Sequence, residues 1–212
     1  MYLKEIWRYP VKSMAGEQLE AAEIGTDGIL GDRIVQARGS RGQVITARTR
    51  PGLLGHKARL SETGELFVDE RLWWTPEVAN DVEVAAGPGV KLVRYEGPHR
   101  FDILPLLIGS DGAYAVLGYD HRRFRPNLVI GGVEGLAERT WEGKRLKVGK
   151  VIIHMVDLRG RCVMTTYDPD TLVQDPSVLR RIALEYDGVF CLNSSVIMGG
   201  SVKIGDPVQL SP

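Results

Sequence analysis

Short stretches in which apolar and polar residues alternate dominate the first half of the chain, and glycines separate them. The first two stretches are 1–7 and 19–24, and two further ones, 33–38 and 43–47, flank Gly39-Ser40-Arg41-Gly42. Alternation with a period of two residues is typical of a strand with one buried face, and a glycine-rich interval between two such runs is typical of a hairpin. The pattern predicts a series of short strands.

Two segments of the second half follow the helical period instead. Ser110 can cap a helix over 111–117 that ends at Gly118, and apolar residues recur every three or four positions over 178–186 before Asp187-Gly188. Serine is a favoured N-cap and glycine a favoured C-terminal stop, so both segments are predicted as helices. Strands are predicted at 66–68, 82–84, 91–93, 144–148, 150–156 and 201–210.

Length and composition fit a chain made mostly of strands. Glycine makes up 25 of the 212 residues, which suits many tight turns, and 43% of the residues are apolar, which is enough for a core. The length suits one large domain or two small domains that share a core. A barrel closes many short strands without exposed edges. The predicted fold class is therefore mainly β with a few helices, built on β-barrels.

The charge balance indicates which classes of partner the chain is not expected to bind, and the cysteine content indicates its compartment. The 27 basic side chains balance 27 acidic ones, so no basic excess points to nucleic acid or to an acidic membrane surface. No apolar run approaches the ~20 residues that span a bilayer, and Lys4 and Glu5 interrupt the N-terminal pattern, which predicts a first strand and no signal peptide. Cys162 and Cys191 have no CxxC partner. Two such cysteines are typical of reduced thiols in a cytoplasmic protein, although a disulfide between them stays open.

Cys162 is the first candidate for chemistry. It ends the sequence Arg159-Gly160-Arg161-Cys162, in which two arginines favour a thiolate and the glycine allows a ligand to approach the backbone. A thiolate can ligate a metal or attack an electrophile, but most free cysteines are small buried apolar residues, and both interpretations stay open. Cys191 lies between apolar neighbours and is predicted to be buried and inert.

Several basic residues follow turn-like sequence and can bind an anion. Lys12-Ser13 follows Pro10 and offers an ammonium group and a hydroxyl to a phosphate, whereas Arg33, Arg48 and Arg125 each lie next to a turn or a proline. Each of these arginines alone is typical of a solvated surface.

The same residues fall into an ordered pattern that resembles the MOSC family, named for the C-terminal domain of molybdenum cofactor sulfurase, together with its N-terminal β-barrel companion. Within the family the chain is similar to the mitochondrial amidoxime reducing component and to bacterial stand-alone proteins. The matching stretches are Tyr9-Pro10-Val11-Lys12-Ser13, Gly31-Asp32-Arg33, Thr46-Ala47-Arg48, Phe124-Arg125-Pro126-Asn127-Leu128-Val129-Ile130, Arg161-Cys162 with Thr165-Thr166, Asp168-Pro169-Asp170-Thr171 and Val202-Lys203-Ile204-Gly205-Asp206.

The resemblance implies two parts, an N-terminal β-barrel subdomain over 1–95 and a MOSC domain over 96–212, which share a cleft for molybdenum-molybdopterin. It implies that Lys12, Ser13 and Arg33 hold the cofactor's phosphate and that Ser110 and Arg125 lie along the pterin. Cys162 is implied as the sole protein ligand of the metal. The remaining implied cofactor-binding residues are Arg48, Asn127, Gly160 and Arg161, and the implied catalytic residues are Cys162, Arg161 and Asp168. Asp168 can instead simply cap its own Asp-Pro turn.

The sequence departs from the family pattern in three places. Ile34 stands near a position that is usually aromatic, Gly160 replaces a hydroxyl residue of the amidoxime reducers, and the segment between Arg48 and Ser110 is shorter than in larger relatives. These departures put the substrate class in doubt.

Three functions stay open from the sequence. The first is an oxidoreductase that reduces N-hydroxylated or N-oxide small molecules, supplied with electrons by a separate protein. The second is a carrier of cofactor or of sulfur, with a persulfide on Cys162 and a separate pyridoxal-phosphate-dependent sulfur donor. The third is a domain that binds another phosphorylated ligand without turnover.

Overall fold

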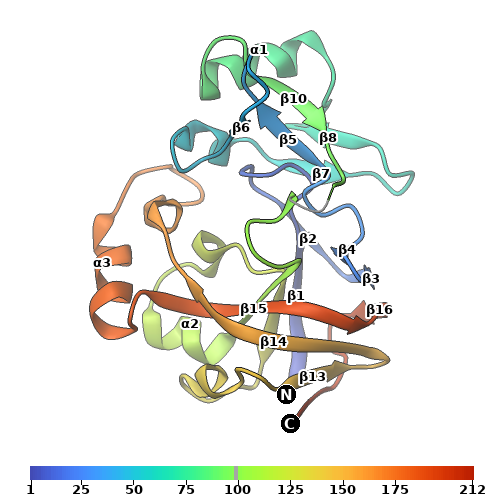
Figure 1. The fold of residues 1–212 in the computed structure, drawn as a ribbon, viewed down its shortest axis with the longest axis vertical. Coiled ribbons are helices and arrows are strands. Elements are labelled where there is room, and N and C mark those ends of the chain that lie inside the picture. The colour runs from blue at the N-terminus through green and yellow to red at the C-terminus, as the bar shows by residue number, and fades with distance from the viewer. Residues whose placement is uncertain (98–99) are drawn as a thin grey trace.

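The computed structural model describes residues 1–97 and 100–212, and these residues form many strands and three α-helices (Figure 1). The fold is mainly β, as the sequence predicts. The strands of the first part are β1 (Tyr2–Arg8), β2 (Glu17–Leu19), β3 (Ala21–Gly25), β4 (Gly28–Ile29), β5 (Val35–Arg38), β6 (Val44–Ile45), β7 (Ala58–Leu60), β8 (Leu66–Val68), β9 (Arg71–Leu72) and β10 (Lys91–Arg94). Those of the second part are β11 (Leu106–Ser110), β12 (Leu128–Gly131), β13 (Arg145–Val148), β14 (Val151–Gly160), β15 (Val189–Met198), β16 (Gly200–Lys203) and β17 (Val208–Ser211). The helices are α1 (Pro76–Ala86), α2 (Asp111–Leu117) and α3 (Pro176–Glu185), and short 3-10 turns are η1 (Pro51–Gly55), η3 (His121–Phe124), η4 (Ala137–Thr140) and η5 (Val163–Thr166).

The largest sheet has eight strands in the order β17-β13-β14-β15-β11-β12-β1-β2. Its seven strands from β17 to β1 close into a ring, because the start of β1 also pairs with the residues before β17. Tyr2 forms a bridge with Pro207, the Leu3 amide donates to the Asp206 carbonyl at 2.9 Å, and the Val208 amide donates to the Met1 carbonyl at 3.0 Å. Eighteen buried apolar residues, including Leu3, Ile130 and Ile153, pack together as the core of this part.

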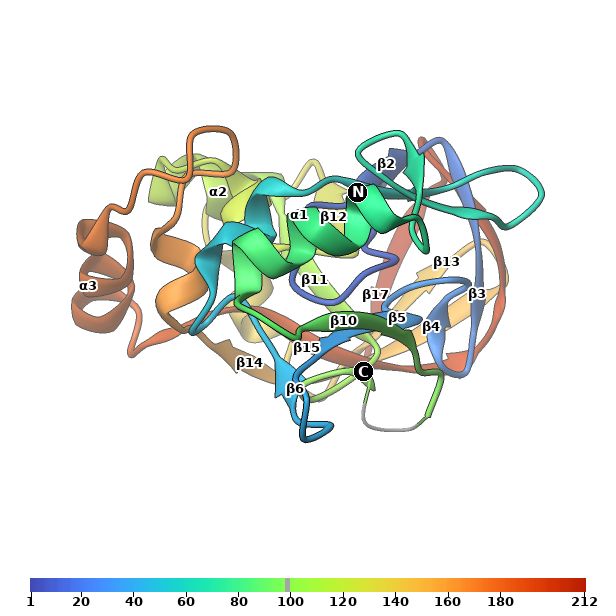
Figure 2. The ribbon, with the colours of Figure 1, turned by 90° about the horizontal axis from the view of Figure 1, so that it is seen from above.

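A second apolar core lies under smaller sheets at the other end of the molecule. The strands β10-β5-β6 form one sheet and β7-β8-β9 another, and α1 packs beside β10 (Figures 1 and 2). The predicted hairpin around residues 39–42 is confirmed, since Ala37 pairs with Ile45 and Arg38 with Val44. The Gly39 amide closes the turn by donating to the Gln43 carbonyl at 3.0 Å.

The two parts interlock through their first strand. The strand β1 belongs to the N-terminal part by sequence but pairs with β12 in the large sheet, with Ile6 opposite Leu128. The chain then turns out of this sheet at Pro10 and bridges to β5 through Val11 and Val35. The segment between β1 and β2 therefore lies at the junction of the two cores, and the predicted anion-binding residues 12 and 13 lie on it.

One predicted strand is wrong, another is too short, and the strand predicted over 201–210 is divided into β16 and β17. Residues 82–84 belong to helix α1, whose buried residues Val78, Val82 and Ala86 recur every four positions along one face. The strand predicted to end near Val156 is β14, which runs to Gly160 with interruptions in its pairing.

Both predicted helices are confirmed. In α2 the Ser110 hydroxyl accepts a hydrogen bond from the Ala113 amide, and Gly118 ends the helix in the left-handed conformation. In α3 the cap is the Asp175 carboxylate, which accepts from the Ser177 amide. In the described part of the chain, no helix has the length and apolar character needed to cross a membrane.

Candidate functional site

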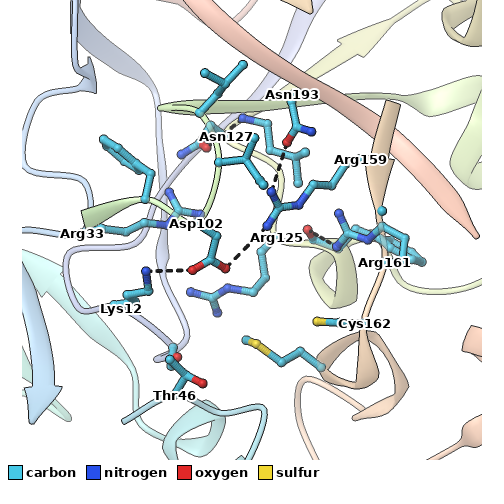
Figure 3. Close-up of a pocket in the computed structure, with 18 of the residues that line it drawn as sticks. Lys12, Arg33, Thr46, Asp102, Arg125, Asn127, Arg159, Arg161, Cys162 and Asn193 are labelled. Carbon is cyan, nitrogen blue, oxygen red and sulfur yellow. Dashed lines mark hydrogen bonds and ion pairs between the residues drawn. The ribbon is translucent and has the colours of Figure 1, made fainter. Parts of the chain in front are cut away.

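A cavity lies between the two parts, and residues from both line it (Figure 3). Its basic lining residues are Lys12, Arg33, Arg48, Arg123, Arg125, Arg159 and Arg161, and its other polar or sulfur-bearing ones include Ser13, Thr46, Asp102, Asn127, Cys162, Met164 and Asn193. Nine of the predicted site residues therefore share one cavity, namely Lys12, Ser13, Arg33, Arg48, Arg125, Asn127, Gly160, Arg161 and Cys162. The cationic character is strong, since seven basic side chains face one carboxylate.

The loop after β1 presents Lys12 and Ser13 to the cavity. Ser13 has a φ of 73°, and its hydroxyl oxygen accepts a hydrogen bond from the Ala47 amide at 3.0 Å. Because that oxygen acts as an acceptor, the hydroxyl hydrogen stays available for a ligand. The Lys12 ammonium group donates to the Arg100 carbonyl at 3.0 Å and pairs with Asp102 Oδ1 at 2.8 Å.

The ring of Tyr9 supports two of the arginines. The guanidinium carbons of Arg33 and Arg125 lie 5.1 Å and 4.2 Å from its centroid. The Tyr9 hydroxyl donates to the Pro126 carbonyl at 3.1 Å, and burial raises the pKa of this phenol, which keeps it neutral. Cation–π contacts of this kind hold a guanidinium in place without neutralising its charge.

Three arginines of the cavity keep buried N–H groups without a hydrogen-bond partner among the described residues. These atoms are Nη2 of Arg125 and Nε of Arg123 and Arg161. Burial lowers the pKa of Arg125 to about 10. Buried donors without a partner cost free energy, and burial without a counter-ion opposes a positive charge. The cavity is therefore built for an acceptor-rich, anionic ligand.

Cys162 follows the end of β14 and begins the short turn η5. Its side chain is half-buried and lines the cavity, whereas Cys191 is buried, and both thiols are free. This placement confirms the prediction that Cys162 faces the cleft. Close to it, Arg161 donates to the Phe124 carbonyl at 2.9 Å and lies over the Phe124 ring.

Cys191 lies in a tightly packed aromatic environment. Its sulfur lies 3.2 Å from the Tyr114 hydroxyl, and burial raises the pKa of the thiol to about 11. A protonated, enclosed thiol is a poor nucleophile and a poor metal ligand.

Asn127 connects the two parts of the fold beneath the cavity. Its Nδ2 donates to Asp32 Oδ2 at 3.0 Å and to the Trp7 carbonyl at 3.3 Å, and its Oδ1 accepts from the Leu107 amide at 3.1 Å. Asp32 is fully buried, accepts from the Tyr9 amide at 2.7 Å and forms an ion pair with Arg33. With both amide N–H groups in use, the Asn127 side chain is a positioning group for Arg33 and for the loop after β1.

Two predicted site residues do not line the cavity. Ser110 is fully buried, where it caps α2 and donates to Glu138 Oε2 at 2.9 Å. Asp168 accepts from the Asp170 and Thr171 amides of its own turn and pairs with Arg123 at 2.9 Å. The alternative role of Asp168 as a turn cap is thus present in the structure, and it reaches the cavity only through Arg123.

Among the polar cavity residues that the sequence did not indicate are Asp102, Arg123 and Asn193. Arg123 precedes the distinctive stretch at 124–130 by one position, so its proximity to that stretch is the only sequence signal. Asp102 and Asn193 belong to stretches without any motif, and only the fold brings them to the cavity.

The match to protein families agrees with this architecture. The MOSC domain model matches residues 112–209, and the MOSC N-terminal beta barrel domain model matches residues 1–86. Together the two models match most of the chain, in the order that the sequence predicts. The chain belongs to the MOSC domain family and carries the N-terminal domain of that family.

Curated relatives and a solved structure support the assignment. Mitochondrial amidoxime-reducing component 1 from Homo sapiens is 27% identical, over 97% of this chain and 82% of the relative. Mitochondrial amidoxime reducing component 2 from Homo sapiens is 33% identical over 50% of this chain and 37% of the relative. The crystal structure of the YuaD protein from Bacillus subtilis is similar in fold, with a TM-score of 0.52 and 14% identity over 99% of this chain and 94% of the other.

Proposed function

We propose that this protein binds molybdenum-molybdopterin in the cavity and reduces N-hydroxylated or N-oxide small molecules, with electrons from a separate donor protein. The observation that carries the proposal is the joint placement of a free thiol and seven cationic side chains in one cavity. The chemistry of these donors fits the group, since a thiolate is a soft metal ligand and buried N–H donors without partners suit a phosphorylated pterin.

The phosphate end is assigned to the N-terminal loop. Lys12, Ser13 and Arg33 offer an ammonium group, a free hydroxyl hydrogen and a guanidinium held on Tyr9. Arg125 is assigned to the pterin, because its Nη2 is a buried donor that lacks a partner in the described residues. Arg48 and the backbone of Gly160 complete the lining of this site.

The metal end is assigned to Cys162 as the sole protein ligand. When bound, the cofactor supplies the two-electron chemistry that cleaves an N–O bond, and the oxygen leaves as water with two protons. Arg161 stabilises negative charge that develops on oxygen beside the thiolate. Asp168 acts as a positioning residue, because its carboxylate holds Arg123 rather than facing the cavity.

The first prediction tests the two ends of the site separately. Lys12→Ala is expected to lower the content of pterin after expression in a cofactor-producing host, because it removes a cation from the phosphate end. Cys162→Ser is expected to keep the pterin but to lose N-reductase activity, because a hydroxyl is a poor substitute for a soft thiolate. Fluorescence of the oxidised pterin, metal analysis and turnover with a chemical reductant are the measurements.

Cys191→Ser is the matched control, because it makes the same exchange at the buried thiol. It is expected to lower stability while leaving pterin content and turnover per folded molecule unchanged. Full activity in Cys162→Ser would contradict the assignment of the metal ligand. A wild-type protein without N-reductase activity that carries a transferable persulfide on Cys162 would favour the carrier function instead.

A further inference from the structure

Asp102 lies at the centre of the cation cluster of the cavity (Figure 3). Its Oδ1 pairs with Lys12 at 2.8 Å, and its Oδ2 pairs with Arg48 at 2.5 Å and with Arg159 at 3.5 Å. In the described part of the chain it is the only carboxylate among the residues that line this cavity. One side chain therefore neutralises cations that come from both parts of the fold.

The same contacts occupy hydrogen-bond donors that a bound anion would otherwise use. A lysine ammonium group has three N–H donors. In Lys12 two of them are directed to the Arg100 carbonyl and to Asp102, so one remains. Arg33 is likewise paired, with Asp32. A phosphate that reaches Lys12 must compete with acceptors that the protein itself supplies.

The negative charge on Asp102 is permanent in the neutral range. Burial on its own would raise the pKa of this carboxyl, but hydrogen bonds and charges from Lys12 and Arg48 outweigh burial and lower the pKa to about 2. The charge is therefore not relieved by protonation when a second anion arrives, and two anions on one ammonium group repel each other.

We propose that Asp102 is an internal counter-ion that occupies the place of the cofactor's phosphate, keeps Lys12, Arg48 and Arg159 assembled, and sets anion affinity by competing for them. The inference rests on the proposed function, because it takes Lys12 as a phosphate ligand. Asp102 opposes the binding of an anion at this site, whereas the basic side chains of the site favour it. Asp102 lies between β10 and β11, and its side chain is 32% exposed, so a bound anion can reach the cations that it holds.

Binding of inorganic phosphate to the ligand-free protein tests the proposal without the cofactor. Phosphate affinity is measured by isothermal titration calorimetry at constant ionic strength for the wild type, Asp102→Asn and Lys12→Ala. Asp157→Asn is the matched control, because Asp157 lines a neighbouring pocket that shares Asp102 and Arg159 with the cavity but forms no ion pair within the described residues, and asparagine can still accept from Asn193. Circular dichroism establishes that each variant is folded.

Asp102→Asn is expected to bind phosphate about tenfold more tightly than the wild type, because it removes a competing charge of the same sign. Asp157→Asn is expected to bind phosphate within about twofold of the wild type, since Asp157 is not paired with any of the cations in the described chain and solvent screens its charge. Asp102→Glu, which keeps the charge, is expected to bind no more tightly than the wild type. Without phosphate, Asp102→Asn is expected to melt at a lower temperature, since three cations lose their partner.

Two results would overturn the inference, and they differ from failure of the proposed function. Equal or weaker phosphate binding by Asp102→Asn, with binding lost in Lys12→Ala, would mean that Asp102 only positions the cations. A tenfold gain in Asp102→Glu would exclude competition by charge. Equal binding by Lys12→Ala and the wild type would instead remove the phosphate site that the proposed function requires.

Discussion

Single residues in the cavity perform two kinds of task, which their hydrogen bonds distinguish. Arg125 and Arg161 line the cavity and keep buried N–H groups unpaired in the described chain. Asn127 and Asp32 have their polar atoms in use and instead fix the groups around them. Both kinds occur in one stretch of sequence, since Arg125 and Asn127 are two positions apart.

Gly160 offers a prediction at this scale. A Cβ atom added there meets no atom within 4 Å, and the residue lines the cavity. Gly160→Ser is therefore expected to change the free energy of unfolding by less than ~0.5 kcal/mol. Its hydroxyl adds a hydrogen bond of ~1 kcal/mol to a ligand in the cavity, which corresponds to about fivefold in affinity.

The measurement is the fraction of purified protein that retains pterin after dilution, for Gly160→Ser beside Gly160→Ala. The alanine variant fills the same space without a hydroxyl, so it separates polarity from volume. Retention that is equal in the two variants would show that no ligand atom lies within reach of residue 160. Higher retention in the serine variant is the expected result.

At the scale of elements, the ends of the helices could be predicted from the sequence. Whether a segment forms a strand or a helix could not always be predicted. Ser110 and Gly118 bound α2 through local interactions that depend only on nearby residues. In contrast, Val82 and Val84 alternate like strand residues, and only Val78 and Ala86, buried four positions before and after Val82, show the helical face. A three-residue window cannot distinguish the two periods.

The Ser110 hydroxyl stabilises the fold from outside the cavity. Ser110→Ala removes the cap of α2 and the hydrogen bond to Glu138 Oε2, and the expected loss is about 2 kcal/mol in the free energy of unfolding, measured in urea. Pterin content per folded molecule is expected to stay unchanged, because the side chain lies outside the cavity. Ser40→Ala, in the exposed turn after β5, is the control and should unfold like the wild type.

The loss should also depend on pH. Burial raises the pKa of Glu138, and the hydrogen bond from Ser110 works in the opposite direction by favouring the charged form. A raised folded pKa means that Glu138 stabilises the fold at low pH and that this contribution is lost as pH rises through that pKa. Without Ser110 the charged form is penalised further, so Ser110→Ala should cost more at about pH 8 than at about pH 4. A pH-independent loss would contradict this role.

For the whole molecule, the fold class and the shared cavity could be predicted, but the connections between the parts could not. Alternation and glycine turns predicted strands, and the ordered motifs predicted that Lys12 and Cys162 face one cleft, which the structure confirms. The closure of the large sheet depends on the contact of Tyr2 with Pro207, about 200 residues apart, and no local pattern encodes such a pairing. The counter-ion Asp102 was missed for the same reason.

We propose that residues 1–95 and 96–212 are two domains by descent that unfold as one unit. The strand β1 pairs with β12 across the proposed boundary, and Asn127 bonds to Trp7 and Asp32 across it as well. These buried contacts couple the stability of the two parts. Independent domains, in contrast, are joined by linkers that make few contacts.

Asn127→Ala tests this coupling. The substitution takes one donor from the buried Asp32 Oδ2, which keeps Arg33, and removes the side-chain acceptor of the Leu107 amide, and the expected loss is about 2–4 kcal/mol in the free energy of unfolding. Hydrogen exchange read by mass spectrometry should show lower protection in β5 and β10 as well as in β14 and β15. Asn80→Ala, on the exposed face of α1, should leave protection unchanged in both parts. If protection fell in only one part while the other kept its wild-type exchange rates, the two parts would unfold independently, which would contradict the proposed coupling.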